Sequence, residues 1–311
     1  MRRRAFLGRL AGFGGIGAAG IAGYAWGVEP HWPEVVRRDL GVEALPDELS
    51  GTVLVQVSDL HVGRDVDDAY LVSCLRLVRD LRPDVVVVTG DILTFRRGRG
   101  EAQFEQLRGV LQNLPHGRLE TLAILGNHDY GPNWSDGRVA SRVASELVRS
   151  GARVLRNESA LVRGLDIVGV DDLWARRADP ARALSSRQGQ AALVLCHNPD
   201  ALDQLDWGGY EGWILAGHTH GGQCRLPFCS PPILPIKNRR YAAGEVQLPD
   251  GRRLYVNRGL GHLERIRFNV RPEVTAFTLR GEDGAGVRCR ADPPWRKACD
   301  STAPAAKDHA S

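Results

Sequence analysis

The sequence has little lysine, a single methionine and no surplus of either charge over most of its length. Lysine and arginine number 41 and aspartate and glutamate 37, and three of the 41 are lysine. The net charge of +4 comes from four arginines in residues 1–26, a stretch without acidic residues, so the rest of the chain has no net charge. A protein that binds long nucleic acids needs a net basic face that displaces counterions. The charge balance therefore argues against a long nucleic acid as a partner.

Long hydrophobic runs and internal repeats are also missing. Hydrophobic residues make up 43% of the 311 residues and charged residues 25%, which is typical of a folded globular protein. The weakly apolar run 10–26 has 17 residues, of which six are glycine. A stable membrane-spanning helix needs about 20 mostly apolar residues. The composition excludes a polytopic membrane protein, a disordered chain and a collagen-like chain.

The N-terminus has the features of an export signal. Arg3 and Arg4 precede Phe6 and Leu7, and the glycine-rich apolar run follows. This order resembles a twin-arginine signal. We expect residues 1–26 to be a twin-arginine signal peptide or an N-terminal anchor. The twin-arginine translocase is then a partner, and the destination is the periplasm or cell envelope, with an uncleaved segment tethering the protein to the membrane as the alternative to cleavage.

Six cysteines are present, and their spacing does not match a cysteine zinc site. Two pairs are close enough in sequence to form disulfides, namely Cys224 with Cys229 and Cys289 with Cys299. The other two, Cys74 and Cys196, lie inside apolar periodic segments and are predicted to be small buried residues.

Strand-like and helix-like segments alternate through the middle of the chain. Short apolar runs at 52–57, 85–89, 122–125, 192–195 and 213–216 are typical of strands buried on both faces. Helical spacing of apolar residues appears at 69–81 and 138–150. We predict an α/β fold of two packed sheets covered by helices. Residues 27–50 are predicted to be a linker or entry segment, 51–280 the domain and 281–311 a flexible tail.

Each of these five apolar runs stops at a polar cluster of metal-binding type. The clusters are Asp59-Leu60-His61, Gly90-Asp91, Gly126-Asn127-His128-Asp129, His197, and Gly217-His218-Thr219-His220. In α/β sheets, ligand sites collect beyond the carboxyl ends of the strands. Residues two apart on an extended strand end project the same way, so Asp59 and His61 are expected to converge, as are His218 and His220.

This ordered series resembles the calcineurin-like metallophosphoesterase superfamily. The resemblance covers roughly residues 54–279 and implies a four-layer αββα sandwich of two packed mixed sheets flanked by helices. It also implies a centre of two metal ions bridged by Asp91. The implied ligands are Asp59, His61, Asp91 and His220 for the first metal, and Asp91, Asn127, His197 and His218 for the second. By the same resemblance His128 contacts the substrate and Asp129 orients His128 as a hydrogen-bond acceptor.

The ligand types agree with the chemistry of phosphoester hydrolysis. Two dications about 4 Å apart neutralise the phosphate and make hydroxide from bound water near neutral pH. Imidazole, carboxylate and amide ligands without thiolate suit manganese, iron or zinc, and argue against Cu(I). The predicted reaction is in-line attack of a metal-bridging hydroxide on phosphorus, with His128 stabilising the phosphoryl oxygens or protonating the leaving group.

Two further segments bear on the substrate. Asp171 and Asp172, in Gly169-Val170-Asp171-Asp172, resemble the exported bacterial branch of the superfamily, which is similar to UDP-2,3-diacylglucosamine pyrophosphatases; either aspartate supports the ligands or caps a turn. The proline-rich stretch 225–241 has apolar residues and the basic Arg239 and Arg240, so it forms either an apolar wall with a cationic rim or an ordinary packed loop. Arg239, Arg240 and Arg258 are the candidate substrate-binding residues.

The predicted substrate is a phosphodiester, phosphomonoester or pyrophosphate in an envelope lipid or cell-wall precursor, which makes a phospholipid-like molecule and a membrane or cell-wall surface expected partners. Two alternatives stay open. One is a nucleotide phosphatase or nuclease, and the other is a metal-containing envelope-binding protein without catalysis.

Overall fold

The computed structural model describes residues 19–63, 65–96, 98 and 100–282. The Arg3-Arg4 motif, Cys289, Cys299 and nearly all of the predicted tail lie outside the described residues. Residues 19–27 are helical. Across the part of the chain that is described, every helix is too short or too polar to cross a membrane.

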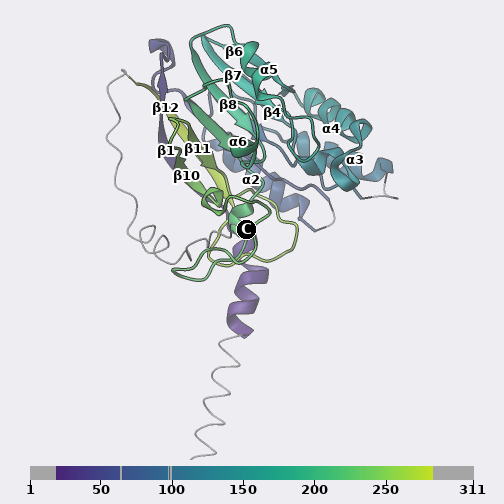
Figure 1. Cartoon of the computed structure of the whole chain (residues 1–311). Coiled ribbons are helices and arrows are strands. Elements are labelled where there is room, and N and C mark those ends of the chain that lie inside the picture. Colours follow the sequence, from purple (N-terminus) through teal and green to yellow (C-terminus); the bar gives the residue numbers. More distant parts are fainter. Residues whose placement is uncertain (1–18, 64, 97, 99, 283–311) are drawn as a thin grey trace, which may run out of the picture.

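Two six-stranded mixed sheets form the centre of the fold (Figure 1). The first sheet has the order β1 (Glu34–Glu43), β12 (Glu273–Glu282), β2 (Val53–Val57), β3 (Val85–Thr89), β4 (Glu120–Ile124) and β5 (Arg153–Val154). The second has the order β10 (Gly244–Gln247), β11 (Arg253–Val256), β9 (Trp213–Ala216), β8 (Ala191–Cys196), β7 (Leu165–Val170) and β6 (Glu158–Val162). Strands β2 to β5 are mutually parallel, and so are β11, β9, β8 and β7. Their carboxyl ends therefore share one edge in each sheet.

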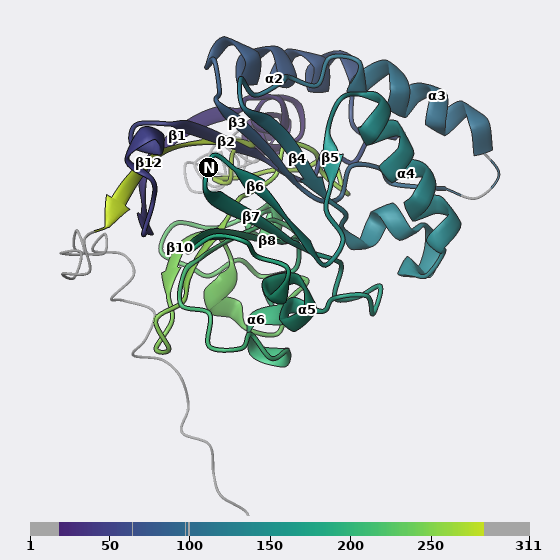
Figure 2. The same cartoon turned by 90° about the horizontal axis from the view of Figure 1, so that it is seen from above.

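Helices cover the outer face of each sheet, which confirms the predicted αββα sandwich. In Figure 2, α2 (Asp68–Asp80), α3 (Gly100–Leu111) and α4 (Gly137–Arg149) lie over the first sheet, and α5 (Pro180–Ser185) and α6 (Ala201–Gln204) lie on the far side of the second. Alternate residues of one strand enter different apolar layers. Val55 packs with the helices on the first sheet, whereas Leu54 packs between the sheets. Because both faces of these strands are buried, they are largely apolar.

The prediction of a linker over residues 27–50 was wrong. Residues 34–43 form β1, which pairs in parallel with β12 along ten residues, and Leu40 and Val42 are buried between the sheets. The sequence of this segment suggests a linker because prolines flank it and because Arg37, Arg38 and Asp39 are charged. An edge strand tolerates such residues, since one side of it faces solvent.

The cysteines of the described chain are all free thiols. Cys74 and Cys196 are buried in apolar clusters, as predicted. Cys224 and Cys229 lie in the loop after β9 and are not joined, so the structure does not contain the disulfide that their spacing allows.

Candidate metal centre

The polar clusters of the two sheets meet at the carboxyl ends of β2, β3, β4, β8 and β9. The backbone N–H of His218, after β9, donates to both carboxylate oxygens of Asp59, after β2, at 3.1 Å each. Below this contact, the side-chain amide of Gln56 donates to the carbonyl of Ala216 and to the hydroxyl of Thr89, both at 2.9 Å. The bonds from His218 to Asp59 and from Gln56 to Ala216 join the two sheets at the site, so residues far apart in sequence are held at fixed positions.

Asp59, His61 and His220 form the first group of potential metal ligands, and all three are buried. The Nε2 atoms of His61 and His220 are 3.0 Å apart, and the His220 Nε2 lies 3.4 Å from Oδ1 of Asp59. Burial lowers the pKa of both imidazoles well below the usual value. Two neutral imidazole nitrogens that point at one another beside a carboxylate are suited to a shared cation.

Asp91, His197 and His218 form the second group, which is buried as well. The Nδ1 of His197 donates to the carbonyl of Thr89 at 2.8 Å, and the Nε2 of His218 lies 3.1 Å from the carbonyl of Pro235. A carbonyl accepts hydrogen bonds and does not donate them. Nδ1 of His197 therefore carries a proton, and when the ring is neutral its Nε2 keeps the lone pair that a metal-ligating histidine requires. Nε2 of His218 also lies 3.2 Å from the side-chain amide nitrogen of Asn198.

Asp91 lies between the two groups. Its Oδ2 is 3.2 Å from Nε2 of His197 in the second group and 3.7 Å from Nε2 of His61 in the first. Its Oδ1 accepts the backbone N–H of His128 at 2.9 Å, which fixes the carboxylate plane. The carboxylate is thus placed to reach a metal ion on either side.

Asn127 supplies a direct test of whether the residues fit a metal. Its side chain is fully buried, and neither the amide oxygen nor the amide nitrogen has a hydrogen-bond partner. An unpartnered buried amide costs about 1–3 kcal/mol. A metal ion that takes the amide oxygen as a ligand removes the larger part of this cost, so the donor set fits the dimetal centre.

Electrostatics within the site follow from burial and from the pairing of Asp91 with His197. Burial raises the pKa of Asp59 to about 6 and lowers that of His218 to about 3. Burial alone would raise the pKa of Asp91, but the neighbouring His197, His128 and His61 together outweigh it and hold this pKa well below the usual range. Conversely, burial lowers the pKa of His197, and Asp91 more than compensates, giving about 10. Asp91 is therefore an anion at every ordinary pH.

The backbone at the ligands is strained. Asp59, His61, Asp91, His218 and His220 all have positive φ angles, between 49° and 72°. Residues other than glycine rarely adopt this left-handed region, and such outliers concentrate at functional sites. The surrounding structure holds the turns that aim these side chains inward.

Gly126 is required by a close approach of two loops. A Cβ at this position would lie 2.3 Å from Oδ1 of Asp91 and 2.5 Å from its backbone nitrogen. Only glycine lets the loop after β4 pass this close to the carboxylate.

His128 differs from the other site histidines because it is partly exposed. Its ring packs edge-on against His61, with centroids 5.0 Å apart, so it lies at the mouth of the centre. The expected hydrogen bond from His128 to Asp129 is not among the contacts of Asp129. The buried Asp129 carboxylate instead accepts the backbone N–H groups of Ile92, Leu93 and Gly126 at 2.8–2.9 Å. Asp129 therefore braces the loops after β3 and β4, and positions His128 through the backbone.

The structure separates the three arginines proposed to bind substrate. Arg258 is paired with Glu34 and Glu273, so it ties β1 to β12 and does not match the predicted role. Arg239 and Arg240 are exposed in the loop after β9, where Arg239 donates to the carbonyl of Pro231. These two remain placed to meet a ligand that approaches from solvent.

Asp172 caps a turn, whereas Asp171 bonds side chains of other segments. Asp172 accepts the backbone N–H of Ala175 at 2.7 Å, and Asp171 bonds Tyr130 and Arg156. Of the two roles left open by the sequence, the structure favours the turn cap for Asp172.

Several residues near the site carry no local sequence signal. Arg267 is fully buried, and its guanidinium lies 3.4 Å from Nδ1 of His220. Trp134 and Trp174 stack with ring centroids 4.5 Å apart, and Trp174 meets His218 edge-on at 4.5 Å. The tryptophans form one wall of the site beside the second ligand group. Only the tertiary fold brings these side chains to it.

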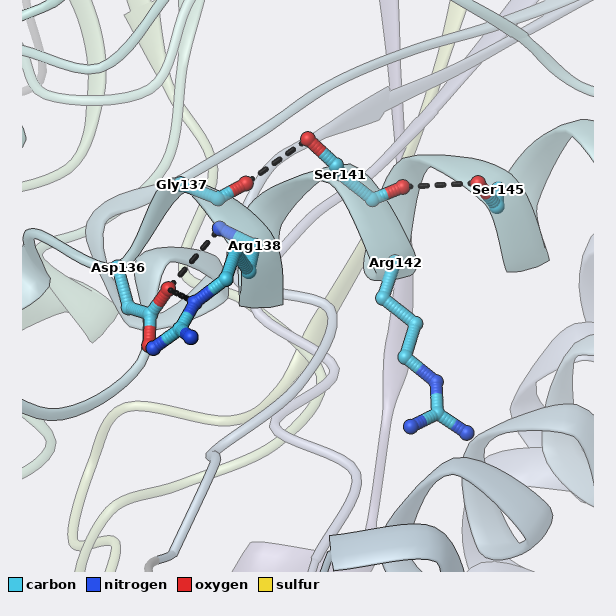
Figure 3. A pocket seen from close by; sticks show the side chains of 6 residues that line it. All are labelled: Asp136, Gly137, Arg138, Ser141, Arg142 and Ser145. Carbon is cyan, nitrogen blue, oxygen red and sulfur yellow. Dashed lines mark hydrogen bonds and ion pairs between the residues drawn. The ribbon is translucent and has the colours of Figure 1, made fainter.

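An open hollow along α4 is separate from this centre (Figure 3). Its polar side chains bond locally: Asp136 accepts the backbone N–H of Arg138 at 2.9 Å, and Ser141 donates to the carbonyl of Gly137 at 2.8 Å. These bonds cap and support the first turns of the helix. The hollow contains none of the predicted metal ligands.

Several known proteins are similar to this chain. The sequence profile of the calcineurin-like phosphoesterase family matches residues 52–222. The chain is 31% identical to "Phosphodiesterase YaeI" of Escherichia coli over 89% of this chain and 98% of that protein. It is 30% identical to "UDP-2,3-diacylglucosamine pyrophosphatase LpxG" of Chlamydia trachomatis over 83% of this chain and 93% of that protein. Among solved structures, a dimetal phosphatase from Danio rerio is 12% identical, with a TM-score of 0.43 over 74% of this chain and 99% of that one.

Proposed function

Because the chain belongs to the calcineurin-like phosphoesterase family and is a metal-dependent phosphoester hydrolase, we propose that it cleaves a pyrophosphate or phosphodiester bond in a lipid-linked precursor of the cell envelope. The main support for metal-dependent hydrolysis is the position of Asp91 Oδ2 between His61 and His197. Manganese, iron and zinc are the metals that the donor set suits.

The lipid part of the proposal is supported by the similarity to LpxG and by the loop after β9. A relative whose name specifies a diacylated glucosamine pyrophosphate matches most of the chain. In the loop, Leu226, Phe228 and Ile233 are 62%, 86% and 78% exposed, and the loop reaches the centre through the bond between Pro235 and His218. An apolar surface that borders a phosphate-binding site suits a substrate with both a phosphate and acyl chains.

The protein side chains have separate roles in the proposed reaction. Bound metal ions would neutralise the phosphate oxygens and lower the pKa of water. Asp91 lies between the two ligand groups, and the Thr89 carbonyl accepts the Nδ1 proton of His197, which leaves Nε2 of the neutral ring for a metal ion. His128, which is partly exposed beside His61, donates a hydrogen bond to a phosphoryl oxygen or a proton to the leaving group.

The experiment that tests the substrate class is a hydrolysis panel with the metal-loaded protein. It contains bis-p-nitrophenyl phosphate, a nucleotide, a phospholipid and a UDP-linked diacyl sugar. We expect the highest kcat/KM for the lipid-linked pyrophosphate. A nucleotide cleaved more efficiently than either lipid would contradict the proposal and favour a nucleotide phosphatase.

We also propose that the twin-arginine route exports the protein to the cell envelope, on the basis of Arg3, Arg4 and the glycine-rich run after them. Replacing both arginines with lysine should leave the protein in the cytoplasm. Normal export of that variant, measured by cell fractionation, would exclude this route.

A further inference from the structure

Exposed apolar side chains gather on three segments at one end of the molecule. The segments are residues 19–28, the loop 223–241 and the loop 262–268, and we call them together the docking face. Its large exposed apolar residues are Ile21, Trp26, Val28, Leu226, Phe228, Ile233, Leu263 and Ile266, each between 41% and 86% exposed. Isolated exposed apolar residues are ordinary, whereas a cluster marks an interaction site.

The three segments form one connected surface. The backbone N–H of Arg267 donates to the carbonyl of Ala25 at 2.9 Å, which joins the third segment to the first. Gln223 and Phe268 are linked through their backbones at 2.9 Å, which joins the third to the second. In Figure 1 the purple helix of residues 19–27 leaves the molecule at the same end as the green and yellow-green loops after β9 and β11.

The charge of the docking face is mostly positive. The three segments contain a single acidic residue, Glu264, and six basic residues, of which all but the buried Arg267 reach the surface. These are Arg225, Lys237, Arg239, Arg240 and Arg265. Residues 27–311 as a whole carry no net charge, so this concentration is local. The residues that precede the helix add four arginines and no acid.

The docking face also adjoins the metal centre. Its second segment follows His220 directly, and the Pro235 carbonyl in that segment lies 3.1 Å from Nε2 of His218. A surface beneath these loops is therefore next to the reacting groups.

We propose that the docking face binds the surface of a bilayer that contains anionic lipid, with its apolar side chains inserted among the head groups. Apolar side chains surrounded by arginine and lysine are what such an interface recognises, because burial and attraction to anionic head groups act together. The role that we assign to this binding, delivery of a lipid-linked substrate to the metal centre, rests on the proposed function. The binding itself does not require catalysis.

The test is co-sedimentation of the full chain with vesicles of phosphatidylcholine alone or mixed with phosphatidylglycerol. The double variant Leu263→Asp, Ile266→Asp changes two exposed residues of the docking face that lie outside the metal centre and outside the loop proposed to meet the substrate. Val148→Asp is the matched control, because Val148 is 59% exposed on α4. We expect the parent and the control to bind the phosphatidylglycerol vesicles and the double variant to bind about tenfold less. Added salt should weaken the binding of the parent.

Hydrolysis of bis-p-nitrophenyl phosphate is measured on the same samples to show that the double variant is folded, and its rate should equal that of the parent. Equal vesicle binding by the double variant and the parent would overturn the proposal, as would a parent that binds neither vesicle. Self-association abolished by the double variant, without vesicle binding, would also overturn it in favour of a second copy of the chain. Vesicle binding that persists without hydrolysis of any substrate would refute the proposed function and leave the docking face supported.

Discussion

Oδ2 of Asp91 lies 3.2 Å from Nε2 of His197, across the boundary between the two sheets. Asp91 follows β3 in the first sheet, and His197 follows β8 in the second. The centre therefore exists only when the sheets are packed together. Substitutions that disturb the sheet-to-sheet contacts should affect metal binding even where they are distant from the ligands.

Replacing Gly126 with alanine should disable the centre without unfolding the protein. The new methyl group would lie 2.3 Å from Oδ1 of Asp91 and displace the carboxylate. Misplacing a group in an active site by about 1 Å reduces activity about 100-fold. The measurement is the rate on bis-p-nitrophenyl phosphate together with metal content. Gly109→Ala is the control, because nothing lies within 4 Å of that position in α3. Its activity should be unchanged and its stability raised by about 0.5–1 kcal/mol. Equal activity of both variants would show that the clash is absent.

Arg267 should be essential for stability. Its guanidinium donates to the backbone carbonyls of Arg258, Gly259, Gly261 and Val270, and the side chain is completely buried. Arg267→Met leaves buried carbonyls without donors, so the free energy of unfolding should fall by about 3 kcal/mol in urea titrations.

Exposed Arg265 provides the control for Arg267. Arg265→Met removes a charge from the surface and should change the free energy of unfolding by no more than about 0.5 kcal/mol. Similar losses in the two variants would mean that the buried bonds of Arg267 contribute little.

Stability should fall in acid partly because of His262. Burial lowers the pKa of this imidazole to about 4, and its Nε2 bonds the Asp65 carbonyl at 2.9 Å. The unfolded chain, with an ordinary pKa near 6.5, binds a proton that the folded chain does not, so stability from this group is complete above about pH 6.5 and is lost as the pH falls toward 4.

His262→Gln removes this titration, and its side-chain amide can keep the bond to the Asp65 carbonyl. Between pH 6.5 and 4, the free energy of unfolding of the parent, measured by urea titration, should fall by about 2–3 kcal/mol more than that of the variant. Parallel pH profiles would contradict the assignment.

The free thiols should differ in reactivity. Cys229 is exposed, whereas burial raises the pKa of Cys74 to about 11 and also raises that of Cys196. Alkylation of the native protein followed by peptide mapping should modify Cys229 rapidly and leave Cys74 and Cys196 unmodified. Fast labelling of Cys74 would indicate that the packing of α2 on the first sheet is loose.

The sequence predicts the sandwich and the place of the ligand clusters well, because both depend on local patterns. Strands buried on two faces are continuous apolar runs, and β2, β3 and β9 were predicted within a residue or two. Strand β1 forms because it pairs with the distant β12. Its local sequence does not predict a strand, since residues 37–39 are all charged. Arg267 lies in a polar stretch that looks exposed, and it is buried only because distant carbonyls converge on it. The contacts of Asp129 were missed for the same reason.

Metal analysis of Asp91→Asn compared with the parent tests the shared carboxylate most directly. The purified parent should contain about two metal ions per chain, because two ligand groups are present and Asp91 of the second lies 3.7 Å from His61 of the first. The variant should retain at most one and lose most of its activity on bis-p-nitrophenyl phosphate. A variant that keeps both ions and full turnover would contradict the assignment of Asp91 as the bridge.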